Sequence, residues 1–521
     1  MQDLAQRLYD EGRFDEAAGV CRDILMRHPR DLNAMHLLGL VHVRRREAAD
    51  AVPLLYAVAA ARPDAGVMND LGSVLAIVGR VDEAIARFRA ALTLQPDCLP
   101  ASINLGKILA ENGRAEEAVP VLRRALALEP DSPATRVQLA NALLEQGNRL
   151  LADDRPREAE CCYREATTLR AEFSEAAANL GTALVAQNRL QEGIEFYRTA
   201  LAWRPGYANT EFSLGLALLM GGAFAEGWRC FEARCDMPAK AATYRRRFDV
   251  PLCRPRDLLS LPAGSTVLLL AEQGLGDMIQ YSRYVPLLVD HGVRVILEAQ
   301  PELHALFRRM RGVTLIAPSD PSPACDAACF LLSLPLTFAT GLATVPANVP
   351  YLTATAERRV RWEAWLGASH GLRVGLAVSG DPAHPHDRSR SIPLARLAPL
   401  FAVPDCTFVV TQRDVREADR AVIEVTPGLR ATGVALQDFA DTAALLSHLD
   451  LLITVDTSVA HLAGALGLPV WLMLRFSPDY RWLLGRIDSP WYPTMRLYRQ
   501  PSPGDWDTVI DAVGRDLSGL R

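Results

Sequence analysis

The strongest constraint on the fold of this 521-residue chain is a repeat of about 34 residues in its first half. One series of small residues recurs with gaps of 34, 33, 34, 41, 34 and 34 residues: Ala17, Ala51, Ala84, Ala118, Ala159, Gly193 and Gly227. Two further series keep the same period, one of small residues and one of prolines: Gly39, Gly72, Gly106, Ala140, Gly181 and Gly215; Pro29, Pro63, Pro96, Pro130 and Pro205. Such a fixed period is typical of helical arrays, in which each unit buries its apolar face against its neighbours.

The segments that carry these series, such as INLGKILAENGRAEEAVPVLRRALALEP, resemble the tetratricopeptide repeat. Small residues let the two helices of a unit approach closely, and proline stops the second helix. We therefore predict an all-α superhelix of about seven repeats over residues 1–240. The fifth unit carries seven extra residues near positions 148–156. We expect them to lengthen a turn without breaking the stack.

A row of polar residues follows the repeats at the position just before the Leu-Gly pair or its equivalent. The first of these positions holds Leu37, and the next five hold polar residues: Asp70, Asn104, Gln138, Asn179 and Ser213. In tetratricopeptide repeats this position faces the concave groove. An amide carries both a donor and an acceptor, so a ladder of amides can pair with the backbone of an extended peptide. The row resembles the asparagine ladder of the O-linked N-acetylglucosamine transferases; the alternative is that these side chains only face water.

The sequence period changes in the second half. Residues 241–262 are rich in proline and arginine, which predicts a linker. Short apolar runs then alternate with helical stretches, with a helix predicted at residues 356–366; the runs are TVLLL, VRVILEA, VTLIAP, RVGLAVSG, CTFVVTQ, LLITVD and LPVWLML. Continuous apolar runs are typical of buried parallel strands. We predict two Rossmann-like α/β lobes, at residues 263–366 and 367–521, with ligands bound at the carboxyl ends of their strands.

Composition excludes several classes of protein. The net charge of -5 gives no basic surplus for general nucleic-acid binding. The N-terminus lacks the pattern of a secretory signal, so we expect a cytoplasmic protein. The most apolar region, residues 449–476, is interrupted by Asp450, Asp456 and His461, which argues against a membrane span. The ten cysteines show no CxxC pair or histidine at ligand spacing, so we expect no metal site.

The first chemical motif stands at the exit of the first strand of the second half. Gly274 and Gly276 permit a tight turn that can approach a ligand, and Asp277 follows at a helix start. A carboxylate here can cap the helix. It can equally serve as the general base that an inverting glycosyl transfer requires at the acceptor hydroxyl.

The second motif directly follows the strand LLIT. A helix beginning at Thr457 or Ser458 would point free amides and its positive dipole end at a pyrophosphate, without a metal. Asp456 would lie at the lip of the cleft, near a sugar hydroxyl. His461, one turn into the helix, is either a ligand contact or a buried helix residue.

The third motif is a loop with two histidines and two arginines after the strand RVGLAVSG. Arg388 and Arg390 suit diphosphate binding and stabilisation of a departing nucleotide, with a solvated polar loop as the alternative. Gln412 and Asp438 are candidates for holding the base and ribose. A literal DxD at residues 505–507 precedes the last helix, so we predict a helix cap there and no metal.

Five segments of the second half resemble, in order, the heptosyltransferase-like glycosyltransferases of GT-B fold: EQGLGDMIQYSRYVPLL, LEAQPEL, DRSRSIPL, DFADTAALL and TVDTSVAHLAGALGLPVWLML. The bacterial subgroup fused to tetratricopeptide repeats, which includes flagellin glycosyltransferases, is the closer match. The resemblance implies that Asp277 is the catalytic base and that residues 456–461 bind the donor sugar and phosphate. Ser458 stands where heptosyltransferases usually have glycine, which argues against an ADP-heptose donor. Their phosphate-binding lysine also has no counterpart, so Arg388 or Arg390 would substitute.

The resemblance implies a metal-independent, inverting glycosyltransferase that needs no cofactor besides its nucleotide-sugar co-substrate. It would glycosylate a Ser or Thr hydroxyl of a protein bound by the repeats, with flagellin as the best single acceptor and a homodimer as a candidate assembly. One alternative is a heptosyltransferase-like enzyme acting on a glycan or lipid-linked acceptor. Another is a scaffold whose sugar domain is inactive.

Overall fold

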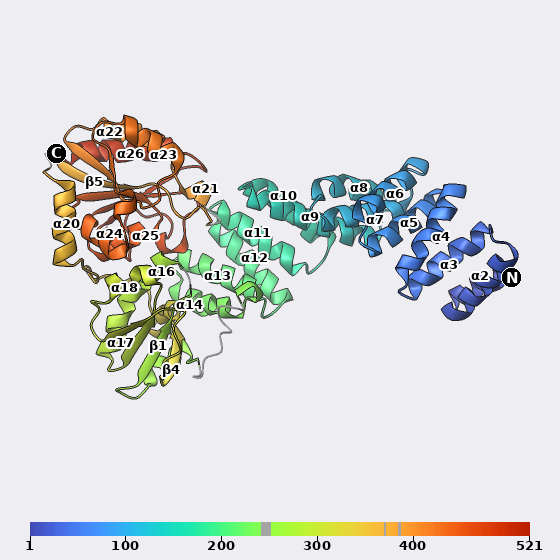
Figure 1. The fold of residues 1–521 in the computed structure, drawn as a ribbon, viewed down its shortest axis with the longest axis horizontal. Helices are drawn as coiled ribbons and strands as arrows, with labels where there is room; N and C mark the ends of the chain where they lie inside the picture. The colour runs from blue at the N-terminus through green and yellow to red at the C-terminus, as the bar shows by residue number, and fades with distance from the viewer. Residues whose placement is uncertain (241–251, 273, 369–370, 384–386, 521) are drawn as a thin grey trace. The chain divides into compact units, whose positions relative to one another are not determined.

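The structure, a computed structural model, describes residues 1–240, 252–272, 274–368, 371–383 and 387–520 (Figure 1). It divides into two compact units. The first unit comprises Met1–Gln187 and Arg198–Pro205, and the second comprises Asn188–Tyr197 and Gly206–Arg521. None of the helices in the described ranges is both long and apolar enough to cross a membrane.

Seven antiparallel helix pairs follow one another in the repeat region, which confirms the predicted tetratricopeptide repeats (Figure 1). The pairs are α1 (Gln2–Asp10) with α2 (Phe14–Arg27), α3 (Leu32–Arg44) with α4 (Ala48–Ala61), α5 (Ala65–Ile77) with α6 (Val81–Leu94), α7 (Leu99–Glu111) with α8 (Ala115–Leu128), α9 (Pro133–Ala152) with α10 (Pro156–Leu169), α11 (Ser174–Ala186) with α12 (Leu190–Trp203), and α13 (Ala208–Met220) with α14 (Phe224–Phe231).

The recurring spacing of small residues reflects close contact between the two helices of a pair. A Cβ atom added to Gly72 on α5 would lie 2.7 Å from Cε1 of Phe88 on α6. On Gly39 of α3 it would lie 3.0 Å from Cγ of Leu55 on α4. In both pairs a glycine faces a large apolar side chain, so a larger residue at the glycine would push the helices apart.

The seven extra residues of the fifth repeat extend a helix, which corrects the prediction of a longer turn. Helix α9 has 20 residues, whereas α7 and α11 have 13 each. Seven residues rotate an α-helix by about 700°, within about 20° of two full turns, so the same face is presented again. Ala140 keeps the spacing to Gly106 in the preceding repeat, while Gly147 packs on Tyr163 of α10, with a Cβ–Cε1 separation of 2.5 Å if a Cβ were added.

The second unit contains two parallel sheets. The first has the order β3-β2-β1-β4, from β1 (Thr266–Leu270), β2 (Arg294–Glu298), β3 (Val313–Ile316) and β4 (Ala327–Phe330). The second has the order β10-β9-β8-β5-β6-β7, from β5 (Leu372–Ala377), β6 (Cys406–Val410), β7 (Arg430–Ala431), β8 (Leu451–Val455), β9 (Val470–Leu474) and β10 (Met495–Arg499). The seven apolar runs named from the sequence all form strands; β4, β7 and β10 were not anticipated.

Helices cover both faces of the second sheet. Figure 1 shows α22 (Ala398–Phe401), α23 (Glu417–Val425) and α26 (Trp506–Gly519) on one side, and α24 (Phe439–Leu446) and α25 (Ser458–Ala465) on the other. The remaining α-helices of the second unit are α16 (Leu275–Tyr281), α17 (Val285–Asp290), α18 (Pro301–Phe307), α19 (Leu334–Thr337), α20 (Ala356–Leu366) and α21 (Asp387–Arg390). Helix α20 has its predicted bounds. Asp505 caps α26 by accepting a hydrogen bond from the Thr508 N–H (3.1 Å), which confirms the predicted cap.

The last helix pair packs with the α/β part, so the compact units divide earlier than the predicted domain boundary at residue 240. Trp228 on α14 is buried and donates from Nε1 to the carbonyl oxygen of Thr340 (3.0 Å). The centroid of its ring lies 6.5 Å from that of Tyr281, 6.2 Å from that of Tyr480 and 6.3 Å from that of Trp491. An aromatic core therefore joins the last repeat to α16 and to the segment between β9 and β10. Residues 241–251 of the predicted linker lie outside the described residues.

Candidate functional site

A cleft of about 840 Å³ opens at the carboxyl ends of the strands in the second unit. In the second sheet, β6 lies on one side of β5 and β8 on the other, so the chain reverses its direction of winding between β5 and β8. Loops that diverge at such a point form the usual ligand crevice of an open α/β sheet. The cleft is lined by the loop after β5, the loop after β8 and the start of α16: Ser379–Ala383, Asp456–Val459 and Gly274–Asp277.

Asp277 lies at this cleft and has both carboxylate oxygens engaged. Its Oδ2 accepts the Gly274 N–H (3.0 Å), which caps α16. Its Oδ1 accepts a hydrogen bond from Nη2 of Arg481 in an ion pair. Burial raises the pKa of Asp277, and Arg481 opposes this rise. The capping role considered from the sequence is therefore present, and the same carboxylate still faces the cleft.

Gly276 permits close packing of two helices, which differs from the tight turn expected from the sequence. A Cβ atom added to Gly276 would lie 3.0 Å from Cδ2 of His461 and 3.4 Å from Cα of Ser458. Gly274 has an ordinary extended conformation with φ of -69°. The start of α16 is therefore pressed against the start of α25, and this contact brings Asp277 and the second motif to one site.

The second motif forms the start of α25, as predicted. Thr457 is the N-cap residue, and Ser458 is the first helical residue. The first amides of a helix have no partner within the helix, so those of this turn point positive charge toward the cleft. Asp456, Thr457, Ser458 and His461 all line the cleft.

His461 is a buried residue that also reaches the cleft. Its Nδ1 lies 2.9 Å from the Tyr492 hydroxyl, and its ring stacks on Trp482 with centroids 5.4 Å apart. Burial, together with Arg481 and Arg283, holds the pKa of His461 well below its usual range. The imidazole is therefore neutral at physiological pH, and its Nε2 lies 3.9 Å from Oδ1 of Asp456.

The surroundings of Asp456 disfavour the ionised form of its carboxyl group. Burial, and then the neighbouring Asp479, raise the pKa of Asp456 to about 6. A carboxyl whose folded pKa is raised binds its proton more tightly in the folded state. The free energy of unfolding therefore falls as pH rises from about 4 to about 6, and the penalty persists above that range.

We accordingly expect Asp456→Asn to stabilise the protein at pH 7.5 but not at pH 4. A quarter of the Asp456 side chain is exposed, so water screens part of the penalty, and the expected gain is on the order of 1 kcal/mol. Chemical denaturation at the two pH values measures it. A loss of stability at pH 7.5, or an equal gain at both pH values, would contradict this origin.

The two arginines of the third motif lie in different places. Arg390 lines the cleft and donates from Nη1 to the carbonyl oxygen of Asp456 (3.0 Å). Its buried Nε has no hydrogen-bond partner in the described part of the chain, with Oδ1 of Asp387 3.9 Å away. Arg388 is exposed and is not among the described residues that line the cleft. His384 and His386 lie outside the described residues.

Gln412 and Asp438 also line the cleft, but their side chains are occupied by the protein. Gln412 accepts the Val378 N–H (2.8 Å) and donates to Oγ of Ser379 (2.7 Å), which fixes the loop after β5. Asp438 caps α24 and forms an ion pair with Arg358. Both residues shape the wall of the cleft, and their polar atoms already have partners.

Sequence reasoning missed Arg481 and Asp479, which line the same cleft. They belong to the segment after β9, where the short 3₁₀ helix η9 (Tyr480–Trp482) presents them. Arg481 is only 8% exposed and donates from Nη1 to Oδ1 of Asp479 (2.8 Å). The available signal was a pair of opposite charges, in PDYRW, a few residues after a buried strand.

The polar row of the repeats forms hydrogen bonds between neighbouring repeats. Four members, on α5, α7, α9 and α11, belong to the first unit, and Ser213 on α13 belongs to the second. Oδ2 of Asp70 accepts a hydrogen bond from Nε2 of His36 (2.8 Å), and Asn104 donates to Oδ1 of Asn69 (2.9 Å). Asn179 donates to Oδ1 of Asn148 (2.7 Å). The side chains of all five members, including Gln138, are half-buried.

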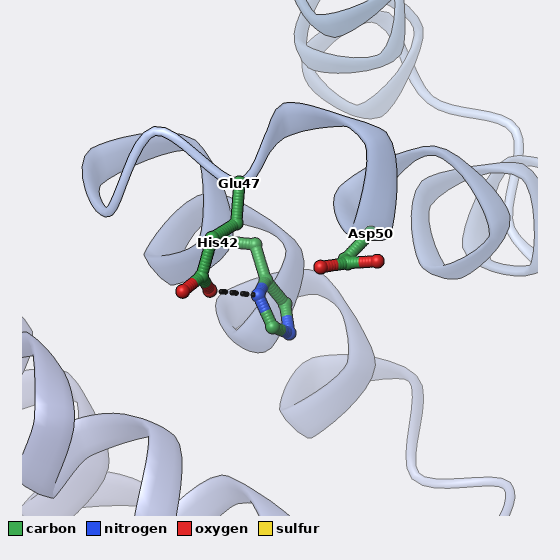
Figure 2. Close-up of side chains that lie close together, drawn as sticks. All are labelled: His42, Glu47 and Asp50. Atoms are coloured by element: carbon green, nitrogen blue, oxygen red, sulfur yellow. Dashed lines mark hydrogen bonds and ion pairs between the residues drawn. The ribbon is translucent and has the colours of Figure 1, made fainter.

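One group of possible metal ligands lies in the first unit, among the residues described. Figure 2 shows His42 near the end of α3 with Glu47 and Asp50 at the start of α4. Nδ1 of His42 lies 2.8 Å from Oε2 of Glu47, and this hydrogen bond explains the position of both side chains. Asp50 is exposed.

Comparison with known proteins supports the repeats. The tetratricopeptide repeat profile matches residues 3–66, 69–133 and 144–208. Protein FlbA of Caulobacter vibrioides is 26% identical over 331 residues, which cover 58% of this chain and 53% of that protein. The chain thus spans about half the length of this relative.

Solved repeat proteins show weaker overall similarity. The C-terminal part of a TPR repeat-containing protein from Cytophaga hutchinsonii is 13% identical, with 47% of this chain and 100% of that chain covered and a TM-score of 0.37. YrrB, described as a TPR protein with an unusual peptide-binding site, is 17% identical, with coverages of 38% and 98% and a TM-score of 0.32. MamA is 22% identical, with coverages of 35% and 97% and a TM-score of 0.29.

Proposed function

We propose that this chain is a glycosyltransferase of GT-B architecture that moves a sugar from a nucleotide-sugar donor to a Ser or Thr hydroxyl of a protein held by its repeats. The observation that carries the proposal is the composition of the cleft. A buried carboxylate, Asp277, lies on the side of the first sheet, and the start of α25 with Arg390 lies on the side of the second.

These groups suit the two charges that develop in glycosyl transfer. The acceptor oxygen attacks the anomeric carbon while its proton passes to Asp277. The bond between the anomeric carbon and the phosphate oxygen breaks, and its electron pair leaves with the nucleoside diphosphate. The first amides of α25 and the guanidinium group of Arg390, which lines the cleft, stabilise that leaving group without a metal ion.

The repeats supply a means of holding a polypeptide. Tetratricopeptide arrays bind proteins, and the polar row offers amide groups to an extended backbone. Flagellin is the first acceptor to test, on the strength of the sequence resemblance to flagellin glycosyltransferases.

The direct test combines donor binding with transfer. Isothermal titration with UDP-, GDP-, ADP- and CMP-linked sugars identifies the donor, and intact mass of unmodified flagellin incubated with that donor measures transfer. A mass increase equal to one or more sugar residues, retained in EDTA, is the expected result. Donor binding with no transfer to any protein in a cell extract would instead favour a glycan or lipid-linked acceptor, and no binding would reject the proposal.

The polar row gives a separate prediction on acceptor binding. Replacing Asn104 and Asn179 together with alanine should raise KM for the protein acceptor by about 10-fold, because two hydrogen bonds of about 0.5–1.5 kcal/mol each are lost. The kcat at saturating acceptor should stay unchanged, since neither residue lies at the cleft. Steady-state kinetics separates the two constants, and Lys107→Ala on the same helix α7 is the matched control. An unchanged KM would remove the row from the acceptor site.

A further inference from the structure

Arg481 holds three side chains at the cleft through separate nitrogen atoms. Its Nε donates to Oε1 of Gln280 (2.6 Å), its Nη1 donates to Oδ1 of Asp479, and its Nη2 donates to Oδ1 of Asp277. The guanidinium also lies over the ring of Tyr480, with Cζ 4.5 Å from the centroid. Arg481 is therefore a nearly buried cation on the segment after β9 that reaches across to α16.

This contact has a chemical consequence for Asp277. A carboxylate that accepts a proton in the transition state must offer an oxygen with enough electron density to the acceptor hydroxyl. Both oxygens of Asp277 are already hydrogen-bonded, one to a backbone amide and one to a full positive charge. Arg481 thus partly neutralises the charge of the proposed base.

The surroundings of Arg481 suit a bound diphosphate, whose oxygens could accept hydrogen bonds from Arg481. Arg390 lines the same cleft, and the positive charges of both arginines lower the pKa of Asp456 against the effect of burial. The start of α25 lies beside Asp456. A diphosphate bound at that helix start would lie among these guanidinium groups, whose planar forks match phosphate oxygens.

We propose that Arg481 is shared between Asp277 and the diphosphate of the donor, so that donor binding uncovers the base. This inference rests on the proposed function and assigns Arg481 as a further donor-binding residue. When the diphosphate enters, a phosphate oxygen replaces Asp277 as the acceptor of the Nη2 hydrogen bond. Asp277 then accepts the proton of the attacking hydroxyl, and Arg481 remains with the departing diphosphate as the glycosidic bond to it breaks.

The test is a double-mutant cycle on binding of the full-length protein to nucleoside diphosphates. Isothermal titration with UDP, GDP, ADP and CDP, and with inorganic pyrophosphate, would compare wild type, Arg481→Gln, Asp277→Asn and the double variant. We expect Arg481→Gln to weaken binding by about 10- to 100-fold, as for the loss of one charge-assisted hydrogen bond. Asp277→Asn should tighten binding by several fold, because it releases Arg481. In the Arg481→Gln background the same replacement should bring no such gain.

The control for simple removal of negative charge is Asp414→Asn, since Asp414 is an exposed residue of the same cleft. A gain in affinity cannot arise from a damaged fold, so the Asp277→Asn result stands even if Arg481→Gln loses stability. Equal tightening by Asp277→Asn in both backgrounds, or unchanged binding in Arg481→Gln, would overturn the sharing of Arg481 and leave the proposed function in place. Failure of the wild type to bind any diphosphate or pyrophosphate would overturn both.

Discussion

Replacing Asp277 with asparagine should lower kcat for glycosyl transfer by roughly 10²–10⁴-fold, the usual contribution of a positioned general base. An asparagine Oδ1 can still accept the Gly274 N–H that begins α16, so the helix start is preserved. The loss then reports the missing proton acceptor. Because burial raises the pKa of Asp277, wild-type kcat/KM should fall as pH drops through that raised pKa.

Single-turnover kinetics with saturating donor would measure this loss. Asp414→Asn should change the rate by less than about 3-fold, because Asp414 is exposed and water screens its charge. If Asp277→Asn keeps a near wild-type kcat, Asp277 is not the general base. Asp456, with its pKa of about 6, would then be the next residue to replace.

The second large effect concerns stability, at the junction of the last repeat with the first sheet. Arg234 lies in the 3₁₀ helix η1 (Glu232–Asp236) that follows α14, and it forms an ion pair with Glu272 just after β1 (2.8 Å). Both side chains are completely buried. We expect Arg234→Met to lower the free energy of unfolding by about 3–5 kcal/mol, because it breaks a completely buried ion pair by removing its cation.

Tryptophan fluorescence during chemical denaturation would follow this change, since all tryptophans except Trp203 belong to the second unit. Adding Glu272→Gln to Arg234→Met also removes the buried negative charge and should restore part of the loss. Arg396→Met, which breaks an exposed pair with Asp507 in the same unit, should change stability by less than about 1 kcal/mol. Equal effects of the buried and exposed replacements would show that burial of the pair is unimportant.

The sequence predicted those parts of the fold that are encoded in local patterns. The 34-residue period depends on contacts between neighbouring helices, so glycine and alanine reveal it directly. Strands such as β5 and β8 are largely apolar runs flanked by turns, so they can also be recognised in the sequence. By contrast, β7 has only two residues, and β10 mixes arginine with apolar residues because it lies at the edge of its sheet.

Parts of the site could not be predicted because they depend on contacts between distant segments. Arg481 and Asp277 are 204 residues apart, and no motif around Arg481 indicates its partner. The motifs did identify several of the residues that line the cleft, including Asp277, Arg390 and Asp456. They could not show that Gln412 and Asp438 are held by protein groups, nor that Arg388 faces away, since side-chain direction follows from the folded loop.

The lengthened helix α9 indicates which changes of length this array tolerates. An insertion of three or four residues would rotate all later positions by about 60° or 40° and turn Gly147 away from Tyr163. An insertion of seven brings each contact back to its own side of the helix. Natural or engineered variants of such arrays should therefore gain or lose helical residues in sevens. Helix α9 of the fifth repeat is one example, with seven residues more than α7 or α11.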